Sequence, residues 1–245
     1  MILLADIGNS RLKWVTLEGG AFRRRGQTSH GKADWAEIAA RQWGSLPAPT
    51  RVLLVSVAGS EARATLAAWI ERRWAIQPEF VLATAAACGI RNAYLDQPER
   101  LGADRWVAMI AARALTRQPC CVVDCGTAVT LDALTADGQH LGGVIVPGMR
   151  LMREALYRDT RQIPPEGGTP QLFGRNTRDC VWGGSVHAVA AAIDGISTRM
   201  MAAGGAGLRL LTGGDAETVL PYLVESYRLE AELIFQGLRV IAEQG

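Results

Sequence analysis

The sequence is short of lysine, of net charge and of long apolar runs, and each shortage excludes a class of function. Lys13 and Lys32 are the only lysines among 26 basic residues, and the formal net charge is +2. So small a charge does not provide the positive surface that binds nucleic acid or an anionic membrane. No uninterrupted apolar run reaches the about 18 residues of a membrane span. We therefore expect neither nucleic acid nor a membrane as a partner.

Paired cysteines are also missing. The chain has five cysteines, an odd number, and they lack the paired spacing of zinc ligands. This pattern is typical of reduced thiols in an intracellular protein. The first residues enter a strand pattern without a basic leader or a cleavage site, so we expect a cytoplasmic location.

What the sequence does contain is a repeated hairpin. In the first copy an apolar run ends in Asp6-Ile7-Gly8-Asn9-Ser10, and the chain returns as a strand over residues 12–17. In the second, an apolar run ends in Asp124-Cys125-Gly126-Thr127, followed by a strand over residues 129–134. The glycine after each acid lets the backbone approach a ligand closely. The pattern predicts two phosphate-binding turns at strand ends.

The elements around the hairpins also repeat. In each half, three strands precede the helices, and a further strand follows at residues 51–57 or 208–211. This order predicts an α/β protein of two similar halves, residues 1–117 and 118–245, with the boundary near Gln118-Pro119. We expect the ligand to bind in a cleft between the halves.

The first hairpin combines groups that suit a phosphate and its metal ion. Asp6 offers a carboxylate to a hydrated metal, Asn9 and Ser10 offer hydrogen-bond donors, and Lys13 adds a mobile positive charge. The alternative is an ordinary Asx-type turn in which Asp6 and Asn9 satisfy backbone amides. The second copy favours the functional interpretation.

The second hairpin repeats the acid, the glycine and the hydroxyl groups. Asp124, Gly126, Thr127 and Thr130 supply them, so the two turns could hold a phosphate chain from both sides. A third glycine-rich turn, Thr212-Gly213-Gly214-Asp215, follows a predicted strand. Its backbone could pass close to a nucleoside, since no side chain intervenes.

Phosphoryl transfer to an alcohol also needs a group that accepts the hydroxyl proton. Asp104 is the candidate, in Leu101-Gly102-Ala103-Asp104-Arg105 at the start of a predicted helix. The alternative is an acid favoured in the first turn by the helix dipole, worth about 0.3–1 kcal/mol. Arg105 could bind a substrate carboxylate in a bidentate manner.

These motifs, in this order, resemble the type III pantothenate kinases, which belong to the superfamily of acetate and sugar kinases, heat-shock chaperone ATPases and actin. The segments 6–13, 101–105 and 124–130 are similar to the family's first phosphate, substrate and second phosphate motifs. The segments 142–148 and 174–177 are similar to two further family signatures. The resemblance implies duplicated ribonuclease H-like, actin-like ATPase domains and in-line, ATP-dependent phosphorylation of pantothenate to 4'-phosphopantothenate, the first step of coenzyme A biosynthesis.

The resemblance also implies roles for single residues. Asp104 would be the general base, and Asp124 would lie at a monovalent-cation site for potassium or ammonium, beside the magnesium that accompanies ATP. ATP contacts are implied for Asp6, Ile7, Gly8, Asn9, Ser10, Arg11, Leu12, Lys13 and Thr127. Pantothenate contacts are implied for Tyr94, Gly102, Ala103, Asp104, Arg105 and Thr177. Like the family, the protein is expected to be a homodimer.

Two other functions fit parts of the pattern. A regulatory nucleotide-binding protein is one, because some proteins resembling this family have been named as accessory factors for transcription, although the low net charge disfavours direct DNA contact. The other is an ATPase of the same superfamily that hydrolyses ATP without an acceptor. Of the remaining residues, Cys125 and His187 are expected to be structural.

Overall fold

The computed structural model describes residues 1–31, 34–160, 163 and 167–244 and divides into two compact units. Unit 1 consists of Met1–Ala114 with Glu232–Gly245, and unit 2 of Leu115–Ala231. The sequence analysis placed residues 118–245, which include the C-terminal helix α7 (Leu233–Gln244), in the second half. In the structure this helix packs within unit 1, where Gly237 lies against the backbone of Val107.

Unit 1 is built on a five-stranded sheet with the order β3-β2-β1-β4-β5. Strand β1 pairs antiparallel with β2 and parallel with β4. The elements of unit 1 are β1 (Ile2–Ile7), β2 (Arg11–Glu18), β3 (Ala21–Ser29), α1 (Trp35–Trp43), β4 (Arg51–Ser56), α2 (Ser60–Trp74), β5 (Glu79–Phe80), β6 (Ala86–Ala87), β7 (Ile90–Arg91), the 3-10 turn η1 (Pro98–Arg100), α3 (Ala103–Leu115) and α7 (Leu233–Gln244).

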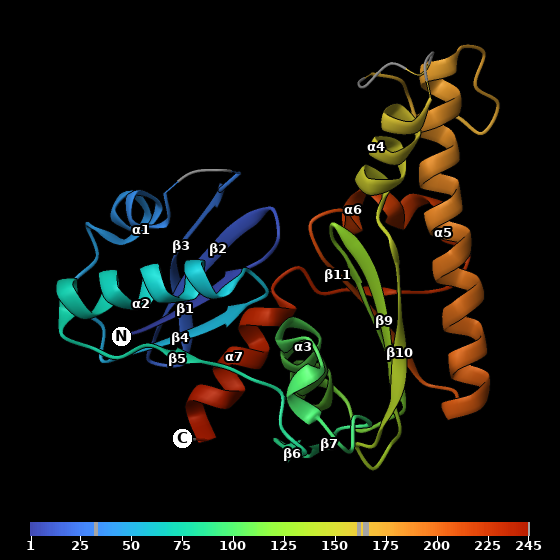
Figure 1. Ribbon diagram of the computed structural model, residues 1–245. Helices are drawn as coiled ribbons and strands as arrows, with labels where there is room; N and C mark the ends of the chain where they lie inside the picture. Colours follow the sequence, from blue (N-terminus) through green and yellow to red (C-terminus); the bar gives the residue numbers. More distant parts are fainter. Residues whose placement is uncertain (32–33, 161–162, 164–166, 245) are drawn as a thin grey trace. The chain divides into compact units, whose positions relative to one another are not determined.

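Helices α1 and α2 cover one face of this sheet (Figure 1). Leu3 and Ile7 of β1 are fully buried beneath Ile38 of α1 and Leu66 of α2. Each such side chain contributes about 1.5–3 kcal/mol by burial, so packing rather than intrinsic propensity holds the short helix α1. Asp34 caps α1, because its carboxylate accepts the backbone N–H of Ala36 at 2.8 Å.

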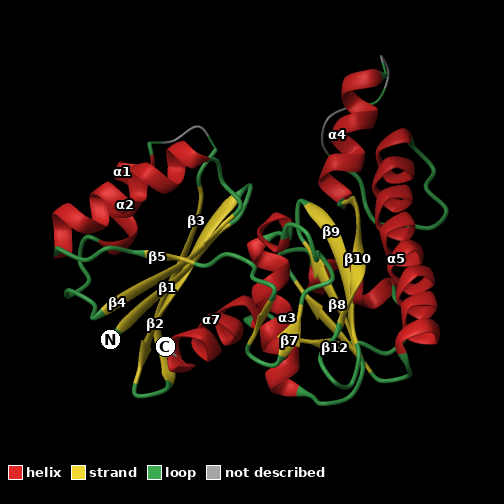
Figure 2. Cartoon of the chain, turned by 60° about the horizontal axis from the view of Figure 1, so that its bottom comes forward, coloured by secondary structure: helices red, strands yellow, loops and turns green. Residues whose placement is uncertain are grey.

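Unit 2 repeats this sheet with the order β10-β9-β8-β11-β12. Figure 2 shows its strands in yellow. Strand β8 pairs antiparallel with β9 and parallel with β11. Its elements are β8 (Cys120–Cys125), β9 (Ala128–Leu134), β10 (His140–Pro147), α4 (Met149–Asp159), α5 (Thr177–Gly204), β11 (Leu208–Thr212), α6 (Ala216–Val219), the 3-10 turn η2 (Leu220–Tyr222) and β12 (Arg228–Leu229).

The long helix α5 covers one face of the unit 2 sheet (Figure 1). Val186, Val189 and Ile193 of α5 are fully buried against Val123 of β8 and Leu131 of β9. The two sheets therefore share one strand order and one pattern of directions. The α/β class and the duplication predicted from the sequence are confirmed.

Candidate functional site

The first candidate phosphate-binding hairpin is the turn between β1 and β2 in unit 1. Asp6 pairs directly with Lys13 across the two strands, which puts the two side chains on the same face about 5 Å apart at Cβ. That face is opposite to α1 and α2, since the residues on either side of Asp6 belong to the core beneath those helices. The N–H of Gly8 donates to the carbonyl of Arg11 at 3.0 Å and closes the turn. The predicted carboxylate and ammonium group thus come together.

A residue that the sequence analysis did not single out holds this turn. His30, which directly follows β3 and is 9% exposed, contacts Gly8 through its ring, with Nε2 2.8 Å from the carbonyl oxygen. The backbone N–H of His30 also donates to the carbonyl of Ser10 at 3.3 Å. The ring packs against Trp35 of α1 at 4.5 Å between ring centroids. No motif spacing could have identified His30, because it lies 22 residues from Gly8 in the chain.

The second hairpin, between β8 and β9 in unit 2, repeats the arrangement. Asp124 pairs with Thr130 across the strands, and the N–H of Gly126 donates to the carbonyl of Ala128 at 3.0 Å. Here too the acid faces away from the covering helix, since the residues beside it belong to the core under α5. Thr127 lies at the tip of the turn, half-buried.

The glycine-rich turn after β11 lies against this second hairpin. The N–H of Asp215 donates to the carbonyl of Cys125 at 2.9 Å. Gly213 has φ +102°, and a Cβ at this position would lie 2.4 Å from both Asp124 Oδ1 and the Cys125 carbonyl oxygen. Two oxygen atoms therefore converge where only glycine fits. The glycine therefore lets the turn pack directly against the Asp124 carboxylate.

Two neighbours complete the surroundings of the second hairpin. The N–H of Gly148, the residue after β10, donates to the carbonyl of Thr127 at 3.1 Å. Cys125 is fully buried, and burial together with the carboxylates of Asp124 and Asp215 raises the pKa of its thiol. A buried thiol of this kind stays protonated and packs as a small apolar group, as the sequence analysis expected.

Asp104 lies in the first turn of α3 in unit 1. Its Oδ1 accepts the backbone N–H of Arg105 at 2.8 Å, and the N–H of Trp106 donates to the carbonyl of Gly102 at 3.0 Å as the helix begins. A Cβ at Gly102 would lie 2.6 Å from Asp104 Oδ1, so the missing side chain leaves room for the carboxylate. The N-terminus of a helix stabilises a negative charge at this place.

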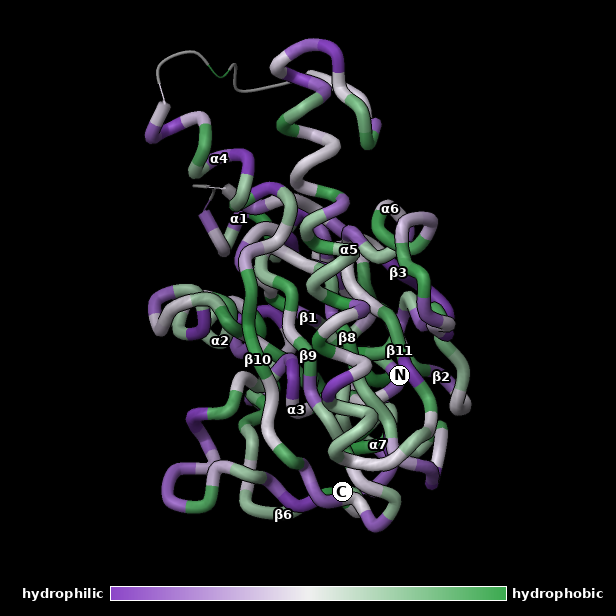
Figure 3. Tube along the Cα trace, turned by 90° about the vertical axis from the view of Figure 1, so that its right-hand side faces the viewer, coloured by the Kyte–Doolittle hydropathy of each residue, from purple (hydrophilic) through white to green (hydrophobic). Residues whose placement is uncertain are grey.

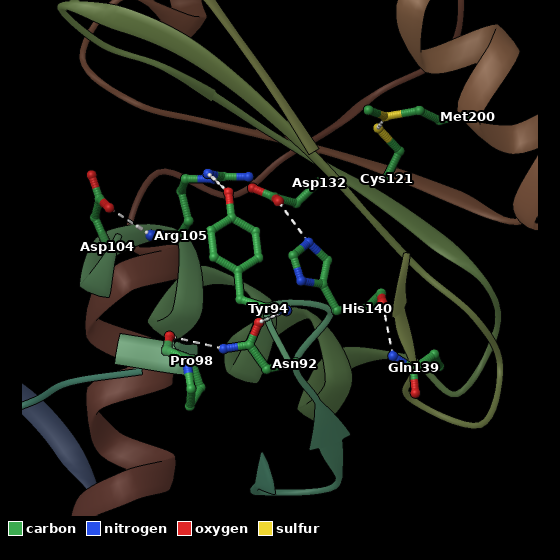
Figure 4. Close-up of polar contacts among 10 residues, drawn as sticks. All are labelled: Asn92, Tyr94, Pro98, Asp104, Arg105, Cys121, Asp132, Gln139, His140 and Met200. Carbon is green, nitrogen blue, oxygen red and sulfur yellow. Dashed lines mark hydrogen bonds and ion pairs between the residues drawn. The ribbon is translucent and has the colours of Figure 1, made fainter. Parts of the chain in front are cut away.

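Arg105, the next residue of α3, extends its guanidinium towards Tyr94 (Figure 4). Arg105 is 8% exposed, and its Nη1 lies 3.5 Å from the Tyr94 hydroxyl. The side chain of Asn92 fixes the backbone next to Tyr94. It accepts the Tyr94 N–H at 2.9 Å and donates to the carbonyls of Thr84 and Pro98 at 3.2 and 3.1 Å. Asn92 is another positioning residue that the sequence analysis missed. A largely buried guanidinium beside a hydroxyl suits recognition of a carboxylate.

Thr177 is the exposed first residue of α5 in unit 2. Asn176 caps the helix by accepting the N–H of Asp179 at 3.0 Å. Asp179 in turn accepts the N–H and the hydroxyl of Thr169 at 2.8 and 3.0 Å, and these bonds lower the pKa of its carboxyl. The segment preceding Thr177 is thereby fastened to the helix.

Most of the predicted residues form one group around α3, one hairpin in unit 1 and one hairpin with the glycine turn in unit 2, whereas Thr177 lies at the start of α5. Over the residues that the structure describes, no cluster of three or more His, Cys, Asp or Glu side chains could hold a metal ion. Nor does any helix in the described part of the chain have the length and apolar character needed to cross a bilayer.

Two sheets of identical order, each with an acid-bearing hairpin between its first two strands, define the duplicated actin-like fold. The chain matches the structure of (R)-2-hydroxyglutaryl-CoA dehydratase component A of Acidaminococcus fermentans with a TM-score of 0.58 and 13% identity, covering 100% of this chain and 96% of the other. Such a similarity shows the fold alone.

Sequence comparison identifies the family within this fold. The family model for type III pantothenate kinase matches residues 2–199. The type III pantothenate kinase of Nitrosococcus oceani is 38% identical over 99% of this chain and 94% of its own length. That of Aromatoleum aromaticum is 40% identical over 100% of this chain and 98% of its own. The chain belongs to the type III pantothenate kinase family.

Proposed function

We propose that the protein catalyses the ATP-dependent phosphorylation of pantothenate to 4'-phosphopantothenate, the first step of coenzyme A biosynthesis. The observation that carries the proposal is the family match over residues 2–199, with relatives that extend over almost the whole chain. The groups described above supply what this reaction needs: a base, a carboxylate-binding pair and phosphate-binding turns.

Asp104 is the general base. Its carboxylate accepts the proton of the pantothenate hydroxyl while the hydroxyl oxygen attacks the γ-phosphorus of ATP in line with the departing ADP oxygen. The bond from the γ-phosphorus to ADP breaks as the new phosphate ester forms. The position of Asp104 at the start of α3, with room left by Gly102, supports this role. General-base catalysis of this kind contributes about 10²–10⁴-fold.

Arg105 and Tyr94 bind the pantothenate carboxylate. The guanidinium and the phenol hydroxyl lie 3.5 Å apart, close enough for one carboxylate to contact both. The backbone of Gly102 and Ala103 and the hydroxyl of Thr177 are assigned to the remainder of the substrate.

The hairpins bind ATP and its cations. In the first, the segment from Asp6 to Lys13 contacts the phosphates, and the paired carboxylate and ammonium group fit a phosphate chain that carries Mg²⁺. In the second, Thr127 contacts ATP. The carboxylate of Asp124 is assigned to potassium or ammonium, because hard cations prefer oxygen ligands. Bound Mg²⁺ offsets the negative charge that develops on the phosphoryl oxygens.

Replacement of the base tests the mechanism. Asp104→Asn keeps the shape of the side chain but cannot accept the proton, so kcat should fall by about 10²–10⁴-fold. The matched control is Glu37→Gln, which also removes an acid from a first helical turn, in α1. A role confined to the helix dipole predicts that both variants lose only about 0.3–1 kcal/mol of stability. Pantothenate-dependent ADP formation measures kcat, and an unchanged kcat in Asp104→Asn contradicts the assignment.

The same assay separates the competing functions. Phosphate release that does not depend on pantothenate would indicate an ATPase without an acceptor. Specific retardation of DNA in a gel shift, with and without ATP, would indicate a regulatory protein. ADP formation only when pantothenate is present supports the kinase.

A homodimer in the cytoplasm completes the proposal. Support for the dimer comes from the edge strand β10, which exposes the apolar side chains of Leu141, Val144 and Ile145, the last at 61%. Figure 3 colours the backbone trace of this strand by hydropathy. An exposed apolar sheet edge favours association with another polypeptide. Light scattering on the eluting protein should give twice the chain mass of 26.3 kDa, and a value near the chain mass contradicts the dimer.

A further inference from the structure

His30 lies outside the first hairpin in the sequence but contacts its turn through both its ring and its backbone. It is buried at 9% exposure, follows β3 directly and contacts two carbonyl groups of the turn. None of the roles assigned above uses this residue. A polar side chain buried so deeply next to a candidate phosphate-binding turn calls for a physical explanation.

We propose that His30 is a positioning residue for ATP binding, which fixes the Gly8-Asn9-Ser10 turn through its ring hydrogen bond to the Gly8 carbonyl. The inference rests on the proposed role of the first hairpin in ATP binding. It extends that role to a side chain that does not itself touch the nucleotide.

The direction of the hydrogen bond follows from its partner. A carbonyl oxygen only accepts, so Nε2 of His30 carries the hydrogen in the bond of 2.8 Å to Gly8. The backbone N–H of His30 donates to the Ser10 carbonyl at 3.3 Å. One residue thus holds the carbonyl on each side of Asn9.

These two bonds also orient the amide groups of the turn. In a trans peptide the C=O and N–H of one plane point in opposite directions. Because the Gly8 carbonyl points towards the His30 ring, the Asn9 N–H of the same plane points away from it. Successive backbone N–H groups that face outward from a turn form the concave surface that binds an anion. His30 therefore acts through the peptide plane between Gly8 and Asn9.

The ring of His30 is itself held in place. Trp35, the first residue of α1, packs on it with ring centroids 4.5 Å apart at an angle of 42°. Trp35 in turn packs against the core beneath α1 and α2. The orientation of the turn is thereby connected to the core of unit 1.

Three substitutions test the proposal. His30→Met keeps a similar volume without a donor, whereas His30→Gln places an amide nitrogen near the position of Nε2. His187→Met is the matched control, because the ring of His187 also packs on an aromatic residue, Tyr222, at 5.1 Å between centroids, but on α5 in unit 2. The measurements are KM for ATP, KM for pantothenate and kcat, together with the melting temperature of each variant.

Loss of one such bond should raise KM for ATP about 3- to 10-fold in His30→Met and leave KM for pantothenate unchanged. His30→Gln should restore KM for ATP to within about twofold of the native value, and His187→Met should change neither KM. A purely structural role predicts equal changes in both KM values, or a lower melting temperature with both KM values native. Either result overturns the inference.

A parallel variant separates this inference from the proposed function. If Asp6→Asn raises KM for ATP and His30→Met does not, the inference fails and the hairpin remains the ATP site. If neither variant changes KM for ATP, the assignment of the hairpin fails as well. Should His30→Met not fold, Trp35→Leu decides, since it loosens the ring but retains the donor. A selective rise in KM for ATP supports the inference, and native kinetics contradict it.

Discussion

The two acidic hairpins occupy equivalent places in their sheets, but the first turn is one residue longer and the two turns are held by different means. Each turn joins the first two strands of its sheet, and in each the residue after the third strand donates its N–H to a carbonyl at the tip. In unit 1 that residue is His30, at 3.3 Å from the Ser10 carbonyl. In unit 2 it is Gly148, at 3.1 Å from the Thr127 carbonyl.

The difference lies beside the glycine of each turn. Next to Gly8 the space holds the imidazole ring of His30, which adds a second hydrogen bond. Next to Gly126 it holds the backbone of Gly148, where a Cβ would lie 2.4 Å from the Gly126 carbonyl oxygen. A turn held by a side chain tolerates any replacement that keeps the donor. A turn held by a close backbone tolerates no side chain at all.

The largest effect on kcat/KM should come from replacing the acid of each hairpin, Asp6 or Asp124. Asp6→Asn removes a charge next to the phosphates and should lower kcat/KM about 10²–10³-fold. Asp124→Asn removes the carboxylate that we assign to a monovalent cation, so the loss of kcat/KM should be about tenfold at saturating potassium. Half-activation by potassium should then require a higher concentration, which a potassium titration at constant ionic strength measures.

The potassium titration can break this comparison in two ways. A normal potassium dependence in Asp124→Asn contradicts the cation assignment of the second hairpin. A shifted potassium dependence in Asp6→Asn contradicts the proposal that only the second hairpin binds the monovalent cation. Total salt is held constant with a choline salt as the control.

A smaller effect should appear when a methyl group is added to each turn. Gly148→Ala forces a Cβ against two backbone carbonyls, at 2.4 and 2.6 Å, and should lower the melting temperature by about 4–8 °C. Gly8→Ala meets only the Arg11 carbonyl oxygen, at 3.4 Å, so the fold should keep its melting temperature. Its Cβ should nevertheless raise KM for ATP, because it enters the space that the phosphates approach. Equal melting temperatures for the two variants contradict the proposed difference.

Local patterns in the sequence predicted most of the fold. The hairpins follow from apolar runs that end in an acid and a glycine, because strand pairing within a hairpin is set by neighbours in the chain. The pairing of Asp6 with Lys13 is a direct result. The two-residue strand β12 was not predicted, since so short a segment has no periodicity. Helix α7 falls within residues 118–245, the predicted second half, but packs in unit 1, because an amphipathic face does not specify its partner.

The parts of the candidate site that the sequence could not predict depend on contacts between distant segments. Gly213 lies against Asp124 because β11 pairs with β8, with Thr212 opposite Asp124. His30 reaches Gly8 only after β3 has crossed the length of β2. Asn92 orders Tyr94 from a loop that has no motif of its own. Sequence patterns supplied the candidate reacting groups, and only the fold showed which residues hold them in place.

The two units also differ in the ion pairs near the edge strands β5 and β12. In unit 1, Arg51 of β4 binds Glu79 of β5 through two hydrogen bonds of 2.8 and 2.9 Å and also donates to the Ala242 carbonyl of α7. In unit 2, Arg209 of β11 lies 3.3 Å from Glu225, which precedes β12. A bidentate pair is stronger than a single contact, so the edge strand of unit 1 should depend more on its pair.

The smallest effect should therefore be a stability difference that depends on pH. At pH 7, Glu79→Gln should lower the melting temperature by about 1–2 °C, corresponding to about 0.5 kcal/mol for a partly exposed pair, and Glu225→Gln by less. The hydrogen bonds from Arg51 hold the pKa of Glu79 below its ordinary value of 4.5. A lowered pKa stabilises the fold above the ordinary value, and this contribution disappears as the pH falls through the lowered one. Melting curves should thus show the gap between the native protein and Glu79→Gln closing below pH 4.5, and a gap that stays constant to pH 3 would mean that the pair contributes no charge-dependent stability.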